Sequence, residues 1–125
     1  MTVQEFLESY GGGQRAFSNL DFEYQERFSN TCFVDIVFEN CFLYLDFRNS
    51  DLTNAQFIGC NLKEIDLWGA YLTNAKMTKC LVESALFKGA IVENFSFDEN
   101  YYYSLTIRHG DFEHRFVNSD IDFKY

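Results

Sequence analysis

The sequence repeats with a period of five residues over most of its length. From residue 42 to residue 117, every fifth position holds an apolar or aromatic residue, sixteen positions in all. With 47% hydrophobic residues overall, such a run has a chance probability of about 10⁻⁵ per phase. The positions are Phe42, Phe47, Leu52, Phe57, Leu62, Leu67, Leu72, Met77, Val82, Phe87, Val92, Phe97, Tyr102, Ile107, Phe112 and Val117.

A period of five fits neither regular element. A helix turns about 100° per residue, so five steps leave a side chain about 140° away from the face on which it began. In a strand, side chains alternate between the two faces, so the fifth residue along points to the opposite side. The chain must therefore turn a corner once in every pentad, so that each pentad presents its central residue to the interior.

The residues around each centre also follow a pattern. A small residue often stands two positions before the centre, and Asp or Asn often stands one position before it, as in SDLTN, CNLKE, IDLWG and AYLTN. This pattern resembles the pentapeptide-repeat family over residues 15–124. The resemblance implies an all-β fold, a right-handed quadrilateral parallel β-helix (solenoid) of about five coils. Each coil would contain four pentads and stack on the next at about 4.8 Å.

The period is interrupted near the N-terminus. The best upstream centres are Phe17, Phe22, Phe28, Phe33 and Phe38, which require one extra residue near Gln25 and a four-residue unit, CFLY, at 41–44. Keeping strict phase would bury polar residues at a cost of several kcal/mol, namely Gln25, Asn30, Asp35 and Asn40. The sequence therefore favours a bulge near Gln25. Whether the irregularities near Gln25 and Cys41 form a plain bulge or a functional loop stays open.

The two ends differ from the repeat. Residues 1–13 are predicted to form a capping helix and a glycine turn, with a Thr2/Glu5 capping box and an end at Gly11–Gly13. This helix would cover the first coil of the β-helix at residues 14–125, because an open coil exposes unpaired strand edges. The C-terminal aromatics either close the last coil or form an end-to-end homodimer interface: Tyr103, Phe112, Phe116, Phe123 and Tyr125.

Stacking by twenty residues places a basic and aromatic stripe on one face: Arg48, Trp68, Lys88 and Arg108. A Trp one coil away from a cation on either side suits cation–π stacking. The stripe is either a recognition surface for a protein partner or a surface ladder whose members satisfy one another.

The neighbouring face is predicted to be acidic and carries Asp35, Asp51, Glu93, Asp111 and Glu113. Like charges stacked one coil apart repel, so they are either retained for a partner or belong to an ordinary solvated face. Asn54, Asn74 and Asn94 recur on this face at a coil corner. Stacked amides can hydrogen-bond from coil to coil, and Asn tolerates corner dihedral angles, which indicates a structural role.

Several function classes are disfavoured. The net charge of −9 argues against direct binding to nucleic acid or to an anionic membrane. The sequence shows neither signal-peptide features nor an apolar run that could span a bilayer, which predicts a cytoplasmic protein. Cys60 and Cys80 are interpreted as small, reduced core residues. His109 and His114 fall on different faces, so no metal is expected, and no cofactor or catalytic motif is indicated.

The favoured interpretation is a non-catalytic module that binds a protein partner. The resemblance implies an alternative, because several family members are acidic rods that occupy the DNA groove of type II topoisomerases. This chain would then be a DNA mimic that modulates or protects DNA gyrase. Its charge is about one per 3 Å of a 25 Å shaft, against one per about 1.7 Å for duplex DNA. A catalytic site between two subunits is the third and least favoured reading.

Overall fold

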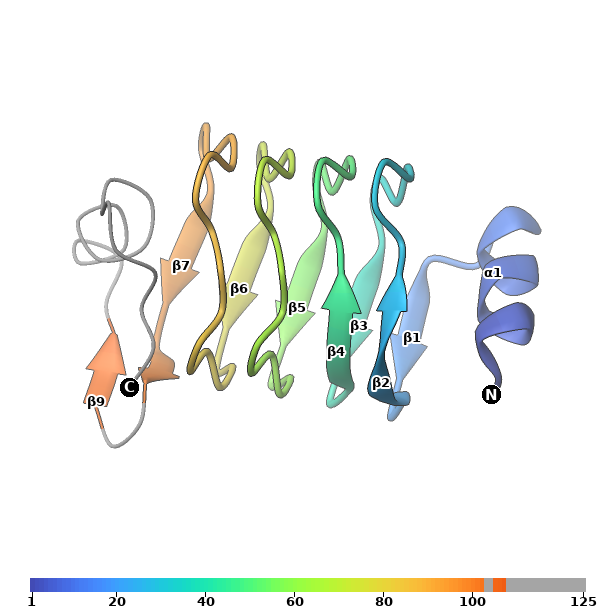
Figure 1. The fold of residues 1–125 in the computed structure, drawn as a ribbon, viewed down its shortest axis with the longest axis horizontal. Helices are drawn as coiled ribbons and strands as arrows, with labels where there is room; N and C mark the ends of the chain where they lie inside the picture. The colour runs from blue at the N-terminus through green and yellow to red at the C-terminus, as the bar shows by residue number, and fades with distance from the viewer. Residues whose placement is uncertain (103–104, 108–125) are drawn as a thin grey trace.

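The computed structural model describes residues 1–102 and strand β9 at residues 105–107. Figure 1 shows a row of stacked coils with one helix at the N-terminal end. The elements, in chain order, are α1 (Val3–Gly11), β1 (Ala16–Ser18), β2 (Asp21–Arg27), β3 (Val37–Glu39), β4 (Phe42–Asp46), β5 (Gln56–Ile58), β6 (Lys76–Thr78), β7 (Ser96–Asp98), β8 (Asn100–Tyr102) and β9 (Leu105–Ile107).

One side of the solenoid, here called the first side, is a parallel sheet in the order β1-β3-β5-β6-β7. Its pairing register brings the pentad centres into line, and all of them are buried: Phe17, Phe38, Phe57, Met77 and Phe97. Five strands in line delimit four coils. The predicted fold class, a parallel β-helix built from pentads, is confirmed.

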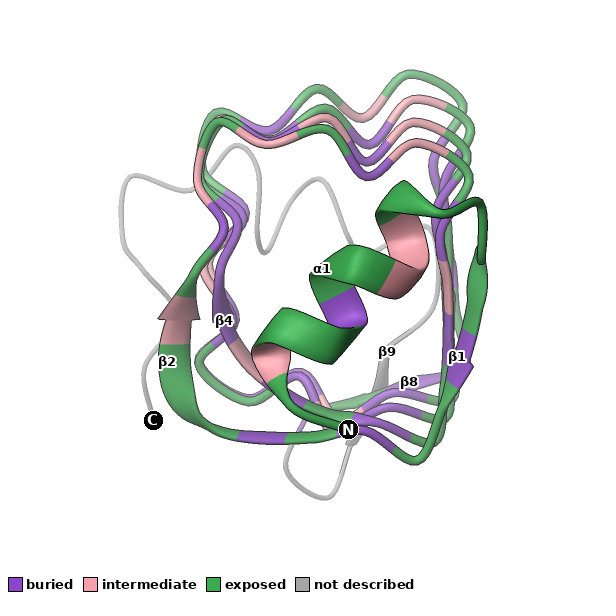
Figure 2. Ribbon diagram, turned by 90° about the vertical axis from the view of Figure 1, so that its right-hand side faces the viewer, coloured by how far each residue is buried: buried purple, intermediate pink, exposed green. Residues whose placement is uncertain are grey.

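The other three sides are held by further parallel pairings between successive coils. Seen along the axis, the coils form a four-sided outline with the buried positions turned inward (Figure 2). The sides are numbered in chain order, and the second side contains strands β2 and β4. The third side contains the centres Phe28, Phe47, Leu67 and Phe87, and the fourth side contains Phe33, Leu52, Leu72 and Val92. Apart from the half-buried Val92, these centres are at most 5% exposed, so they form one continuous core.

Residues in the left-handed backbone conformation form the corners between the sides. Except after Phe22 and Leu43, the residue two positions after a centre has a positive φ, between 54° and 67° where it is not glycine. Because this conformation is costly for most L-residues but tolerated by Asn and Gly, those two types recur there. Asn74 and Asn94 are corner residues, and the Asn94 Nδ2 donates to the Asn74 Oδ1 at 2.6 Å. The predicted hydrogen bond from coil to coil is confirmed for Asn74 and Asn94, whereas the Asn54 amide donates to Asp35 Oδ1.

The Asp or Asn that precedes a centre stabilises the same turn from the other side. The side-chain oxygen accepts a hydrogen bond from the backbone N–H two residues later, at 3.0–3.1 Å, for Asp46, Asp51, Asn61 and Asp66. A short polar side chain that bonds its own backbone in this way is an Asx turn. The bond satisfies a backbone donor that faces away from the core.

Lys79 is a corner residue that is poorly suited to its conformation, and replacing it should stabilise the protein. Its φ is +57°, and a left-handed residue with an ordinary side chain costs about 1–2 kcal/mol. We expect Lys79→Asn to raise the free energy of unfolding by about 0.5–1 kcal/mol, measured by urea denaturation, because Asn tolerates this conformation. Lys76→Asn, at an exposed strand position, is the control and should give no gain. An equal gain from both would contradict the explanation.

The predicted bulge near Gln25 is confirmed. The parallel pairing of β2 with β4 shifts register between Phe22 and Glu26, so extra residues of β2 bulge out of the ladder. Beyond the bulge, Phe28, Phe33 and Phe38 are buried, as the shifted register requires. The four polar residues that strict phase would have turned inward are all exposed: Gln25, Asn30, Asp35 and Asn40.

The prediction that Phe42 is a pentad centre is wrong. Phe42 is 38% exposed, and its neighbour Leu43 is completely buried. The β2–β4 register aligns Phe42 with Asp21 and Leu43 with the buried Phe22, which fixes the inward residue. The four-residue step therefore runs from Leu43 to Phe47.

The prediction that Ile107 is the centre of a further parallel pentad is also wrong. Strand β9 runs antiparallel to β8, and Asn100 pairs with Ile107. The described residues consequently contain four coils and the start of another, against about five predicted for the chain. Because β9 pairs with β8, it occupies a strand edge that would otherwise be open to aggregation.

Helix α1 lies across the N-terminal end of the solenoid (Figure 2). The predicted capping box is present, with Glu5 N–H donating to Thr2 Oγ1 and Thr2 N–H donating to Glu5 Oε1. The helix ends at Gly11, within the predicted glycine turn, and Gly12 is its C-cap residue. Phe6 enters the core, and the Tyr10 hydroxyl donates to the Val34 carbonyl oxygen at 2.8 Å.

Three cysteines lie in one column of the core. Cys41, Cys60 and Cys80 are buried and free, as expected for small reduced core residues. Their thiols donate to carbonyl oxygens of the preceding coil, at Phe17, Phe38 and Phe57 respectively. The hydrogen bond with the Cys60 thiol, together with burial, raises the pKa of Cys41 well above its usual range, so this thiol stays protonated.

Candidate functional site

Two columns of side chains point outward from the third side. One column contains Asp46, Asp66 and Leu86, which are linked by parallel bridges between successive coils. Two residues further along each coil, the second column contains Arg48, Trp68 and Lys88. Backbone hydrogen bonds tie these coils together next to the second column, from Asn49 N–H to the Trp68 carbonyl and from Gly69 N–H to the Lys88 carbonyl. Three members of the predicted stripe therefore occupy equivalent positions in successive coils, as expected.

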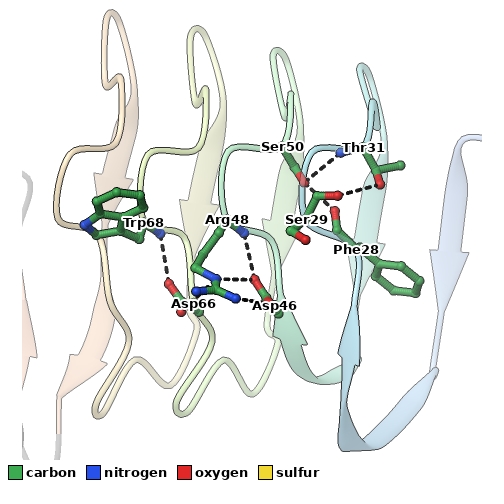
Figure 3. A network of polar contacts seen from close by, with 8 residues as sticks. All are labelled: Phe28, Ser29, Thr31, Asp46, Arg48, Ser50, Asp66 and Trp68. Carbon is green, nitrogen blue, oxygen red and sulfur yellow. Dashed lines mark hydrogen bonds and ion pairs between the residues drawn. The ribbon is translucent and has the colours of Figure 1, made fainter.

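Arg48 is held by two carboxylates. Its Nη2 lies 2.9 Å from Asp46 Oδ2, its Nε donates to Asp46 Oδ1 at 3.0 Å, and the same Nε is 3.7 Å from Asp66 Oδ2 (Figure 3). The hydrogen bond from the Arg48 side chain keeps the pKa of Asp46 below its usual range. Since Asp46 and Asp66 occupy adjacent coils of one column, Arg48 offsets the repulsion between them.

Trp68 is not stacked on Arg48. Its backbone N–H donates to Asp66 Oδ1 at 3.0 Å, and its indole points away from the Arg48 guanidinium, which faces the two carboxylates (Figure 3). Within residues 1–102, the cation that does lie over a ring is Arg15, 4.0 Å from the Tyr10 centroid. The expected cation–π contact between Arg48 and Trp68 is therefore wrong, and the Trp68 side chain is left 49% exposed.

A shallow groove of about 400 Å³ opens between the two columns. It is lined by Arg48, Asp66, Trp68, Leu86 and Lys88. Lys88 is exposed and forms no ion pair with any residue that the structure describes. The groove thus combines an indole and a leucine with an ammonium group that pairs with no carboxylate of the described residues.

The corner next to Trp68 carries almost no side chain. Its residues in successive coils are Gly69 (φ +68°) and Gly89 (φ +75°), and a Cβ on Gly69 would collide with the Asn49 side chain. Beyond this bare corner, on the fourth side, Tyr71 is 50% exposed and Ile91 is 45% exposed. We call the surface formed by Trp68, Tyr71, Leu86, Lys88 and Ile91 the Trp68 corner.

Sequence reasoning did not identify Tyr71, Leu86 and Ile91 as candidate site residues. All three occupy the position before a centre, where the repeat normally has Asp or Asn and where the side chain faces outward. An apolar residue in that position is the sequence signal that could have identified them as exposed apolar residues. Tyr71 and Ile91 continue the column that begins with Asp51, as the bridges between these residues show.

The predicted acidic face is not a continuous column in the described residues. Asp51 is followed in its column by Tyr71 and Ile91, whereas Asp35 is a corner residue and Glu93 stands one position after a centre. Asp51 Oδ1 accepts from the Thr53 hydroxyl at 2.6 Å, and Asp35 Oδ1 accepts from the Asn54 amide at 2.9 Å. The expectation that these charges stack at one spacing is wrong for these three residues.

Several predicted site residues lie outside the described residues. These are Arg108 of the stripe, Asp111 and Glu113 of the acidic face, and the proposed dimer end at Tyr103, Phe112, Phe116, Phe123 and Tyr125. Within the described part of the chain, no three His, Cys, Asp or Glu side chains gather into a possible metal site. No helix there has the length and apolar character needed to cross a membrane.

The stacked pentads, Asx turns and left-handed corners define a repeat protein whose surface is a regular array of outward side chains. A family model described as pentapeptide repeats matches eight copies, over residues 27–63 and 50–89, which together span half of the chain. The chain belongs to the pentapeptide-repeat family. A search of curated proteins found no significant match.

Two solved structures are similar to this chain. One is a pentapeptide repeat protein (Rfr23) from the cyanobacterium Cyanothece 51142, with a TM-score of 0.34 and 19% identity over 74% of this chain. The other is HetL, a pentapeptide repeat protein involved in heterocyst differentiation regulation from the cyanobacterium Nostoc sp. strain PCC 7120, with a TM-score of 0.35 and 22% identity over 80% of this chain. The alignments span 60% and 51% of the lengths of those two proteins.

Proposed function

We propose that this chain is a protein-interaction module and that the Trp68 corner contacts its partner. The observation that carries the proposal is the grouping of exposed apolar residues. Trp68, Tyr71 and Ile91 are each close to half exposed, and they flank one corner on two successive coils. A large apolar residue at such a position loses contact with water only when another molecule covers it.

The composition of the Trp68 corner suits a binding surface. Trp and Tyr are enriched among residues that dominate binding energy, since each buries a large area and loses little rotamer freedom. The bare Gly69–Gly89 corner leaves room for a partner to contact the third and fourth sides together. The rigid coils underneath hold these side chains in place before binding, which lowers the entropy that association costs.

The DNA-mimic alternative, binding to DNA gyrase or another type II topoisomerase, has weaker support. A mimic of duplex DNA needs a regular line of exposed negative charge. Asp51 and Asp35 are engaged in local hydrogen bonds, and the column of Asp51 continues with apolar residues. Unchanged supercoiling by bacterial gyrase in the presence of micromolar protein would exclude this alternative.

Removing the exposed aromatics of the Trp68 corner should abolish partner binding. We expect affinity capture from lysate of the source cells to recover a partner with the native chain and to lose it, by at least about thirtyfold in affinity, with Trp68→Ala. Tyr71→Ala should weaken capture in the same direction. Quantitative capture at several bait concentrations measures the loss.

The matched control is Tyr24→Ala. Tyr24 is 79% exposed, even more than Trp68, but it stands on the β2 bulge at the N-terminal end of another side. Its replacement should leave capture unchanged. Equal losses from Tyr24→Ala and Trp68→Ala would contradict the assignment of the Trp68 corner. Circular dichroism of each variant checks that the fold is intact.

A further inference from the structure

The charges of the groove on the third side are unequally compensated. Arg48 forms an ion pair with Asp46 at 2.9 Å and faces Asp66 at 3.7 Å, so its charge is offset by two carboxylates. Lys88 stands at the other end of the groove and pairs with no described carboxylate. Leu86 takes the place in its column that Asp46 and Asp66 hold in the two preceding coils. The carboxylate that would have compensated Lys88 is therefore missing.

The apolar part of the groove lies next to the Lys88 ammonium group. Trp68 and Leu86 line the groove together with Lys88, and the indole is half exposed. If an apolar side chain of a ligand lay between Trp68 and Leu86, the next residue of that ligand would thus lie close to Lys88. A carboxylate on the neighbouring residue of the same ligand would supply the missing partner.

We propose that the groove binds an extended peptide segment of the partner in which an apolar side chain adjoins an Asp or Glu. The apolar side chain covers Trp68 and Leu86, and the carboxylate pairs with Lys88. This inference rests on the proposed function and specifies the chemistry of the partner. It also sets a direction of selectivity, in which a basic residue next to the apolar one is rejected because it meets Lys88.

The net charge of −9 opposes an acidic ligand only at long range. At physiological ionic strength, exposed charges are screened over about 8 Å, so the groups that line the groove dominate. The groove is lined by Arg48, Lys88 and Asp66, and Asp46 is paired with Arg48, so the two cations and two carboxylates at the groove balance. The corner beside the groove adds no charge, because its residues are Asn49, Gly69 and Gly89.

The test uses the fact that Trp68 is the only tryptophan of the chain. Intrinsic fluorescence therefore reports on the groove itself, without a label. Three blocked peptides that differ in one residue serve as probes: acetyl-GLEFG-amide, acetyl-GLQFG-amide and acetyl-GLKFG-amide. We expect the Glu peptide to bind the full chain about threefold to fivefold more tightly than the Gln peptide, as for an exposed ion pair, and the Lys peptide to bind most weakly.

Two variants assign the selectivity to Lys88. In Lys88→Gln the Glu and Gln peptides should bind equally, and in Lys88→Glu the order should reverse. Lys76→Gln makes the same change in net charge on the first side, where Lys76 is exposed, and should keep the native order. Raising the salt concentration should shrink the native preference but leave the binding of the Gln peptide nearly unchanged.

The outcomes separate this inference from the proposed function. Equal binding of the three peptides, or the same loss of preference in Lys76→Gln and Lys88→Gln, would overturn the role of Lys88. The role of Lys88 would also be overturned if no peptide changed the Trp68 fluorescence up to millimolar concentration. Each of these results leaves the proposed function to be decided by the capture experiment with Trp68→Ala. A loss of capture in that experiment, together with equal peptide binding, would retain the Trp68 corner and reject the acidic segment.

Discussion

Phe6→Ala is expected to lower the free energy of unfolding by about 3–5 kcal/mol, the usual cost of deleting a fully buried phenylalanine ring. Phe6 is completely buried, and its ring centroid lies 4.8–6.0 Å from those of five other phenylalanines, Phe17, Phe22, Phe28, Phe33 and Phe38. These residues are centres of the first coil and the start of the second. One side chain of α1 thus closes the N-terminal end of the core.

Leu7→Ala is the control for this prediction. Leu7 is the next residue of α1, but it is 37% exposed, so its replacement changes helix propensity and little else. We expect a loss below about 1 kcal/mol in urea denaturation. The Phe6→Ala variant should also bind a hydrophobic dye, because loss of the Phe6 ring uncovers the aromatic rings of the first coil. A similar small loss in both variants would show that α1 is not docked on the first coil in solution.

The interior of the solenoid was largely predictable from the sequence. A period of five admits only a chain that turns once per pentad, and the coil length of twenty follows from four such turns. The bulge near Gln25 was predictable for the same reason, because burying Asn30 and Asp35 would have left polar groups without partners. These predictions depend on the sharp energetic contrast between apolar and polar residues.

The same contrast fails where neighbouring residues are both apolar. Phe42 and Leu43 satisfy the hydrophobic pattern equally well, and only the pairing of β4 with β2 decides which one enters the core. The antiparallel pairing of β9 was missed because Ile107 has the right side chain for a further centre. Strand direction depends on backbone hydrogen bonds, which leave no trace in a pattern of side-chain polarity.

For the candidate site, the sequence predicted that Arg48, Trp68 and Lys88 occupy equivalent positions in successive coils, but it did not predict their side-chain contacts. Asp46 occupies the position before a centre, where the repeat favours Asp, yet its contact with Arg48 depends on side-chain conformations that a register cannot specify. As a result the predicted cation–π contact was wrong. Tyr71 and Ile91 were missed because their face was predicted to be acidic. Their position before a centre nevertheless implies that their side chains point to the solvent.

The last large effect concerns Asn100, a completely buried polar residue in the column of the core cysteines. Its Oδ1 accepts a hydrogen bond from the Cys80 N–H at 3.0 Å, and its Nδ2 donates to the Met77 carbonyl oxygen at 2.9 Å. Asn100 is also the first residue of β8, which pairs with β9. A single side chain therefore joins the last complete coil to the antiparallel pair that follows it.

We expect Asn100→Ala to lower the free energy of unfolding by about 2–5 kcal/mol, because it leaves one buried donor and one buried acceptor without partners. Asn100→Cys should cost less, since a thiol can donate to the Met77 carbonyl as the Cys80 thiol donates to Phe57. Hydrogen exchange of the Cys80 amide should accelerate in both variants, because neither retains the acceptor for that N–H. Asn94→Ala removes an exposed amide pair and should cost below about 1 kcal/mol. If Asn100→Ala costs no more than Asn94→Ala, the join between the coil and β8 is made by the backbone alone.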